Sequence, residues 1–160
     1  MAIYLEVEGI KGNVTAEGYK DHIDVQSMCF GVGRGISMDP GNLANREATR
    51  PSISEITITK LMDNSTTSLF KESVTGSSGK KFKLKFVRTG ADKVNEFMNY
   101  ELEDCLVSGY NVSSNGDSQP VETITLSFSK ILINHTDNDA TNKAGSPARV
   151  GYDLASAKPL

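Results

Sequence analysis

The segment from Ser52 to Arg88 constrains the fold of this chain more than any other, because it predicts two strands separated by one short helix. In the first strand, isoleucines alternate with threonines over positions 56–59. Alternation with a period of two is typical of a strand with one buried face and one wet face. The last strand repeats the pattern with three apolar residues and three lysines: Phe82, Leu84 and Phe86 with Lys81, Lys83 and Lys85.

One helix is predicted between these two strands, after three polar residues at positions 63–65 whose side chains can accept hydrogen bonds from the first free amides of a helix. Leu69, Phe70 and Val74 give this helix an apolar side. Gly76 stands where a left-handed residue is expected to end it. No other segment predicts a helix convincingly, so the rest of the chain is expected to form a sheet that this helix covers.

Further strands follow from the same alternation over residues 3–7, 22–36, 94–112 and 121–133. In the second of these, Met28 and Phe30 lie on the opposite parity from Ile23 and Val25, which indicates either a strand buried on two faces or a bulge near Ser27. In the third, one apolar parity is predicted to run unbroken from Met98 through Leu106 to Val112. About seven strands with one helix predict a mainly β fold, an antiparallel barrel or sandwich.

Length and charge restrict the function. At 160 residues the chain is most simply one domain, 1–160. A net charge of −3 argues against nucleic-acid binding, and no apolar run approaches the roughly 20 residues that cross a bilayer. The opening residues lack the features of a secretory signal. Synthesis in the cytoplasm is therefore expected, with Cys29 and Cys105 as free thiols.

Two polar stretches interrupt the alternation. The first, Ser37 to Pro51, is rich in Gly, Pro and Asn, and we expect it to be an exposed arm, since long loops in compact domains are usually functional or disordered. The second is a polar C-terminal tail at about residues 134–149, followed by an apolar patch from Val150 to Leu154.

No catalytic, metal or cofactor motif is complete. The glycines of residues 31–35 lack the spacing and the following helix of a dinucleotide loop, and are expected where backbones approach closely. Residues 137–142 fail the calcium-loop pattern at its fifth and sixth positions. His22 and His135 have no activated nucleophile near them in sequence, and no CxxC pair predicts zinc. We therefore expect no enzyme activity, no metal and no cofactor.

Rows of short, uncharged, hydrophilic residues stand out instead. They occupy the wet parity of two predicted strands: Thr57 and Thr59 in one, and Thr123, Thr125, Ser127 and Ser129 in the other. These rows are explained equally by an ordinary solvent-exposed sheet face and by the wall of a channel that is hydrated but does not bind the molecules passing through it. The sequence leaves both interpretations open.

Taken in order, several segments of the chain resemble the haemolysin co-regulated protein family, whose members form the inner tube of bacterial type VI secretion systems. No segment is specific alone, but their order and spacing together are. The matching segments are residues 9–12, 23–25, 58–60 and 63–65 ahead of Leu69, then 121–128 and 151–154.

The resemblance implies a small antiparallel β-barrel with one flanking helix, similar to phage tail-tube subunits. It implies hexameric rings that stack into a tube, partner with a spike protein (VgrG) and with contractile sheath and baseplate components, and carry or chaperone effector proteins in the lumen. It also implies release of the subunit itself through the apparatus without a signal peptide.

Site residues follow from the resemblance and from the strand pattern. Lumen-facing candidates are Ser27, Cys29 and Gly31, although Cys29 is equally explained as a small filler residue. The arm is implied to reach the neighbouring ring, with Met38, Asp39, Asn42, Leu43 and Arg46 as stacking candidates. Lys81, Lys83 and Lys85 form a charged strand face expected to meet acidic residues such as Glu101 and Glu103.

The chain departs from the family at three aromatic positions, where Met28, Phe30 and Tyr152 stand in place of frequent tryptophans. Because these substitutions keep large apolar side chains, they are expected to affect the range of effectors carried more than the fold. The alternative function is a monomeric β-domain that binds ligands or adheres to surfaces. An enzyme would require convergent titratable groups in a pocket, which neither histidine supplies.

Overall fold

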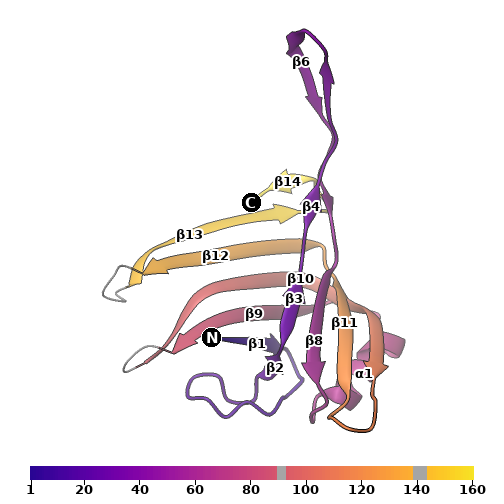
Figure 1. Cartoon of the computed structure of the whole chain (residues 1–160), viewed down its shortest axis with the longest axis vertical. Coiled ribbons are helices and arrows are strands. Elements are labelled where there is room, and N and C mark those ends of the chain that lie inside the picture. Colours follow the sequence, from indigo (N-terminus) through magenta and orange to yellow (C-terminus); the bar gives the residue numbers. More distant parts are fainter. Residues whose placement is uncertain (90–92, 139–143) are drawn as a thin grey trace.

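The computed structural model describes residues 1–89, 93–138 and 144–160, and of residues 38–39, 42–47, 89, 138 and 144 it describes the backbone alone. Antiparallel strands dominate these residues, and one helix lies beside them (Figure 1). The strands are β1 (Ala2–Val7), β2 (Ile23–Val25), β3 (Ser27–Cys29), β4 (Val32–Gly33), β5 (Ile36–Asp39), β6 (Asn42–Ala48), β7 (Ser52–Ile53), β8 (Ile56–Leu61), β9 (Lys80–Thr89), β10 (Val94–Ser113), β11 (Val121–Ser127), β12 (Lys130–Asn138), β13 (Ala144–Asp153) and β14 (Lys158–Pro159), and the helix is α1 (Thr66–Thr75).

The strand pairings form a circuit, as the predicted barrel requires. From β3 the path runs through β8, β11, β10, β9 and β1 to β2. Gln26 then joins β2 directly to β3, and its N–H donates to the Thr59 carbonyl at 2.8 Å. Outside this circuit, β12, β13 and β14 extend the sheet from the first half of β10. The predicted mainly β class, an antiparallel barrel with one short helix, is confirmed.

The core consists of the apolar parity of these strands. Fully burying one such side chain contributes about 1.5–3 kcal/mol to folding. The segment from Ser52 to Arg88 supplies a large share of this core, because the isoleucines of β8 and alternate apolar residues of β9 point inward. Residues with almost no exposed surface are Leu5, Ile23, Ile56, Ile58, Leu69, Phe82, Leu84, Leu102, Ile124 and Leu126.

The opposed parities of the second predicted strand are explained by a change of partner. Ile23 and Val25 are buried where β2 pairs with β1. After Gln26 the chain pairs with β8 instead, and Met28 and Phe30 pack partly buried against the same core. The predicted strand is therefore two strands, β2 and β3, which belong to two parts of the barrel wall and are separated by Gln26.

The prediction of one unbroken apolar parity along β10 is wrong. Asp104 adopts a φ of 51°, in the left-handed region, and the pairing with β9 shifts between Leu102 and Cys105. The extra residue inverts the parity, as a bulge does. Cys105 and Val107 are consequently buried, whereas Leu106 is 36% exposed. Farther along the strand, Val112 is 46% exposed.

Two predictions about the helix are also wrong. Leu69 is buried, but Phe70 and Val74 are 52% and 63% exposed, so the apolar side is mostly uncovered. Gly76 is not left-handed: it is extended, with φ −65° and ψ 115°. A Cβ on Gly76 would lie 2.5 Å from the Glu72 carbonyl oxygen, so close approach rather than positive φ requires the glycine. At the other end, the Asp63 carboxylate accepts the Ser65 N–H at 2.9 Å, and Ser65 makes no side-chain capping bond.

The expected arm is a β-hairpin rather than an irregular loop. Strands β5 and β6 pair through Ser37 and Glu47 and are joined by Pro40 and Gly41, where a φ of 85° explains the glycine. Figure 1 shows this hairpin, here called the arm, projecting far beyond the barrel at one end of the long axis. The predicted polar tail likewise belongs mostly to β12 and β13.

Candidate functional site

The uncharged rows predicted from the sequence form one continuous surface, here called the hydroxyl face. It is the outward side of β3, β8, β11 and the second half of β10. Antiparallel register places the residues of these strands in two rows across the sheet. One row is Cys29, Thr57, Thr125 and Gly109, and the other is Ser27, Thr59, Thr123 and Asn111.

Short side chains keep this face flat and let it satisfy its own hydrogen bonds. The hydroxyls of Ser27 and Thr59 are hydrogen-bonded to each other across the strands. A Cβ on Gly109 would lie 3.1 Å from the Thr125 hydroxyl oxygen, so the glycine leaves room for that threonine. At the edge of the face, Ser108 donates to Glu55 at 3.0 Å. The eight residues of the two rows carry no charge, so the surface binds water without attracting ions of either sign.

Charge on these same strands lies underneath the hydroxyl face. Lys60 and Glu122 are cross-strand neighbours on the inward side of β8 and β11, and neither side chain is exposed. Their side chains form a direct ion pair, and Lys60 Nζ also lies 3.0 Å from an Asp63 oxygen. Burying charge is costly unless each charge is paired and hydrogen-bonded. This cluster meets that condition.

Tyr110 completes the buried cluster. Its hydroxyl donates to the second carboxylate oxygen of Glu122, and burial together with that carboxylate raises the pKa of Tyr110. The Tyr110 ring also contacts Phe70 of α1 edge-on, with 5.7 Å between ring centroids. The cluster therefore links β8, β10 and β11 near the start of α1 and ties the helix to the strands of the hydroxyl face.

The opposite part of the barrel has a surface of different chemistry, here called the charged face. It is the outward side of β1, β9, the first half of β10, and β12. Lys85 Nζ lies 2.8 Å from Glu6, and Lys83 Nζ lies 3.5 Å from Glu101. The hydrogen bond from Lys85 lowers the pKa of Glu6. The predicted meeting of the lysine row with acidic neighbours is thus confirmed for Glu101.

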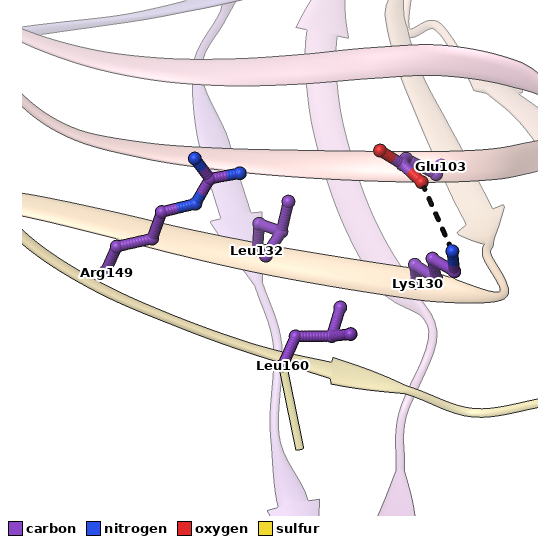
Figure 2. A pocket seen from close by; sticks show the side chains of 5 residues that line it. All are labelled: Glu103, Lys130, Leu132, Arg149 and Leu160. Carbon is purple, nitrogen blue, oxygen red and sulfur yellow. Dashed lines mark ion pairs between the residues drawn. The ribbon is translucent and has the colours of Figure 1, made fainter. Parts of the chain in front are cut away.

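The other acidic candidate, Glu103, pairs with a different lysine. Lys130 Nζ lies 3.9 Å from Glu103, and both line a shallow pocket with Arg149 and Leu160. Figure 2 shows these side chains on one side of the sheet, with Leu132 between Arg149 and the ion pair. Lys81 is exposed and lines another pocket with Glu6, Glu8 and Lys83. The charged face therefore alternates in sign across the strands.

The structure places the sequence candidates as follows. Ser27 and Cys29 are exposed members of the hydroxyl face, whereas Gly31 follows β3 and donates its N–H to Ser54 at 2.9 Å. Both cysteines are unpaired, as predicted. The stacking candidates lie on the arm strands: Met38 and Asp39 on β5, and Asn42, Leu43 and Arg46 on β6.

Other sequence candidates do not assemble into a chemical site. His22 makes polar contacts at 3.1–3.2 Å with Lys85 Nζ and the Lys20 carbonyl, and no nucleophile of the described residues is hydrogen-bonded to its ring. Within the described residues no three metal-ligating side chains converge, and Asp139 lies outside them. The helix in the described part of the chain is too short to cross a membrane. The expected close approach at Gly31 and Gly33 is wrong, since an added Cβ would meet nothing nearer than 4.0 Å.

Sequence reasoning missed the buried cluster. Lys60 continues the inward parity of Ile56 and Ile58, and Glu122 shares the inward parity of Ile124 and Leu126. A lysine and a glutamate on the apolar parity of neighbouring strands are the signal that could have revealed the pair.

Comparison with known proteins gives one consistent result. A family model described as "Type VI secretion system effector, Hcp" matches residues 4–135. Protein hcp1 of Pseudomonas aeruginosa is 23% identical over 154 residues, covering 95% of this chain and 94% of that protein. A solved structure of a type six secretion system protein has a TM-score of 0.90 at 24% identity and covers 99% of both chains. Hcp1 from Salmonella typhimurium has a TM-score of 0.78 at 21% identity, covering 99% of this chain and 98% of that one.

Proposed function

The chain belongs to the Hcp family of type VI secretion proteins, and we propose that it forms hexameric rings that stack into a tube with the hydroxyl face turned to the lumen. Membership of the family makes it a tube or effector protein of this secretion system. The finer statements are our proposal: the number of subunits, the stacking, and the carrying or chaperoning of effectors within the ring. On this proposal the protein acts without catalysing a reaction.

The hydroxyl face is the observation that supports this orientation. A channel that passes folded proteins of varied charge needs a wall that is wetted but offers no fixed charge to hold them. The two rows of short uncharged residues across four strands meet that need. The charged face, by contrast, is suited to the outside of the tube, where paired charges remain solvated.

Partners follow from this orientation. The outside of the tube would meet the contractile sheath, the tip would meet the VgrG spike, and the base would meet baseplate components. Effectors would contact the lumen. Release through the apparatus would take the subunit out of the cytoplasm where it was made.

Cys29 offers a probe of the lumen. It is exposed on the hydroxyl face, whereas Cys105 is buried. In an assembled ring, Cys29 is expected to react with a small maleimide but to be shielded from a maleimide carrying a large polyethylene glycol chain. Equal rates with both reagents in assembled rings would contradict the lumen assignment.

The arm is proposed to act between rings. Removing residues 38–47 and joining the ends with a short turn should leave the single ring intact and impair stacking. Loss of the single ring would show that the arm belongs to the lateral contact instead.

Oligomeric state tests the central proposal. Negative-stain microscopy and light scattering of the purified protein should show closed rings of six subunits, built from head-to-tail contacts. A 17.3 kDa monomer at micromolar concentration would overturn it and favour a monomeric binding module.

A further inference from the structure

His22 is held against the barrel by contacts that require its imidazole to be neutral. Its Nδ1 atom lies 3.2 Å from the Lys20 carbonyl oxygen, which can only accept a hydrogen bond, so Nδ1 carries a proton. Its Nε2 atom lies 3.1 Å from Lys85 Nζ. An ammonium group can only donate, so Nε2 is the acceptor and carries no proton. These two contacts therefore describe one tautomer, a neutral imidazole protonated at Nδ1.

Lys85 is shared between His22 and Glu6. Its Nζ lies 2.8 Å from a Glu6 carboxylate oxygen, and the same oxygen lies 3.8 Å from His22 Nε2. The side chains of His22 and Lys85 are only 12% and 17% exposed, whereas that of Glu6 is 48% exposed. Water therefore screens the imidazole and the ammonium poorly from each other, and a change of charge on one of them acts strongly on the other.

The same two side chains hold the loop that joins β1 to β2 on the barrel. Lys85 Nζ lies 5.7 Å from the centre of the Tyr19 ring, and the Tyr19 ring meets the His22 ring edge-on with 5.6 Å between centroids. Tyr19 also contacts the ring of Tyr4 in β1, at 5.2 Å between centroids. Figure 1 shows this loop at the bottom of the view, at the end of the molecule opposite the arm.

His22 also closes the loop through its backbone. The Val14 N–H donates to the His22 carbonyl at 3.1 Å, and the Gly12 N–H donates to the Asp21 carbonyl at 2.8 Å. The Asp21 N–H donates to the Val14 carbonyl at 2.9 Å. Movement of His22 away from Lys85 would therefore loosen both ends of the loop together.

Protonation of His22 at Nε2 would set two positive charges face to face. Imidazole side chains change charge between about pH 5 and 8, whereas lysine side chains remain protonated over this range. Nε2 and Lys85 Nζ would then both be donors, with 3.1 Å between them. The hydrogen bond from Lys85 lowers the pKa of Glu6, so this carboxylate keeps its charge over the same range. Glu6 is thus the acceptor that a protonated His22 would take.

The other charges near His22 lie farther from its ring. The described groups around it are Glu6 of β1, Lys85 of β9, Lys83 of β9 acting on Glu6, Tyr19 of the loop with Glu96 of β10 bonded to its hydroxyl, and the exposed Lys20 and Asp21 that precede it in the chain. Among these groups, Lys85 is the cation that a polar contact joins to the His22 ring. The response of His22 to protons therefore depends on Lys85.

We propose that His22 is a proton-sensitive latch for the loop between β1 and β2. While neutral it accepts a hydrogen bond from Lys85 and holds the loop on the barrel, and when protonated it turns to Glu6, displaces Lys85 and releases the loop. This inference goes beyond the proposed function and does not depend on it, because every group of the latch belongs to one chain. The loop is then ordered above about pH 7 and mobile near pH 5.

The tautomer of His22 provides the first test. Nitrogen-15 NMR of the ring should show a proton on Nδ1 and none on Nε2 at pH 8, and a proton on both atoms at pH 5. His135 is the other histidine of the chain, and His135→Gln assigns the two sets of signals. A ring protonated mainly at Nε2 at pH 8 would overturn the latch.

Hydrogen exchange measures the release of the loop. After correction for the intrinsic effect of pH on exchange, the amides of Gly12, Val14 and Asp21 should lose protection at least fivefold between pH 7.5 and pH 5.0. His22→Gln is neutral at both values and should change less than twofold. His135→Gln is the matched control and should behave like the unmodified chain. Amides of β8 report global unfolding and should stay protected.

Removing the opposing cation distinguishes a latch from a general loss of stability in acid. In Lys85→Met the imidazole can take a proton with no ammonium beside it, so loop protection should change less than twofold with pH. A fivefold loss that persists in His22→Gln or in Lys85→Met overturns the proposal, and so does the absence of a loss in the unmodified chain. Light scattering of the same samples reports ring formation separately, so failure of either proposal leaves the other standing.

Discussion

The hydroxyl face and the charged face are outward surfaces of the same barrel, and they differ in where charge is placed. On the charged face, Glu6–Lys85 and Glu101–Lys83 pair in the open, between neighbouring strands. On β8 and β11 the pair Lys60–Glu122 is turned inward, and the outward side holds hydroxyls. The comparison teaches that alternation alone does not set surface chemistry: the same period carries charge outward on one part of the barrel and inward on the other.

The inward placement has an energetic consequence. Exposed pairs contribute little, about 0.2–1 kcal/mol each, because water competes for both partners. Removing one partner of a buried pair leaves the other charge without compensation, which costs about 3–5 kcal/mol. The two faces should therefore respond very differently to the loss of one charge.

Breaking the buried pair should produce the largest effect. Glu122→Leu is expected to lower the free energy of unfolding by about 3 kcal/mol, the lower end of that range, because Lys60 keeps Asp63 but loses its closest partner, and the Tyr110 hydroxyl loses its acceptor. Urea denaturation at fixed protein concentration measures the change. Adding Lys60→Met should recover part of the loss, and a loss below 1 kcal/mol for Glu122→Leu alone would refute this account of the cluster.

Reversing the lysine row should produce a smaller effect. Changing Lys81, Lys83 and Lys85 together to glutamate removes two pairs and sets like charges opposite one another, an expected cost of about 1–3 kcal/mol. The midpoint of urea unfolding reports it. Adding Glu6→Lys and Glu101→Lys serves as the control and should restore most of the stability. Unchanged melting and unchanged oligomer size in the triple variant would contradict the charged-face interpretation.

The burial of Cys105, which follows the change of parity in β10 between the charged face and the hydroxyl face, can be tested by measuring stability against pH. Burial raises the pKa of the Cys105 thiol from 9 to about 12. The unfolded chain therefore loses this proton first, and stability should fall as pH rises from about 9 to about 12, by at most about 1.4 kcal/mol per pH unit. Cys105→Ala should flatten this slope and Cys29→Ala should not. Equal slopes in the two variants would show that Cys105 does not contribute.

A charge added to the hydroxyl face should have the smallest effect on stability. Thr123→Lys lies outward between Thr59 and Asn111, and its free energy of unfolding is expected to stay within about 0.5 kcal/mol of the unmodified chain. Recovery of effector protein with the rings should nevertheless fall several-fold, because each ring would then carry lysines around its lumen. Thr123→Ser is the matched control. Unchanged effector recovery would argue for a plain solvated face.

Alternation predicted the framework well. The strand, helix and strand between Ser52 and Arg88 lie as expected, and so do the hydroxyl rows and the contact of Lys83 with Glu101. These features depend on the two-residue alternation of apolar and polar side chains and on the positions of charged residues, both of which can be read directly from the sequence.

Features that depend on a single backbone angle or on a distant partner were not predictable in the same way. The parity change in β10 depends on the left-handed Asp104, and an Asp–Cys pair gives no warning of it. Phe70 and Val74 are more than half exposed because the described residues cover them only in part, Phe70 through its contact with the Tyr110 ring. The Pro40–Gly41 pair was a local signal for the turn of the arm hairpin. The polar residues around it favoured the interpretation as an irregular loop instead.

The length of β10 has a mechanical consequence. Its 20 residues run without a break from the charged face, where it pairs with β9 and β12, to the hydroxyl face, where it pairs with β11. Sliding one part of the wall past the other would require stretching a polypeptide as well as rupturing a ladder of hydrogen bonds. In the proposed tube, this strand would carry mechanical load from the outer wall of a subunit to its lumenal wall as one covalent element, and the lumen would keep its shape while the tube moves.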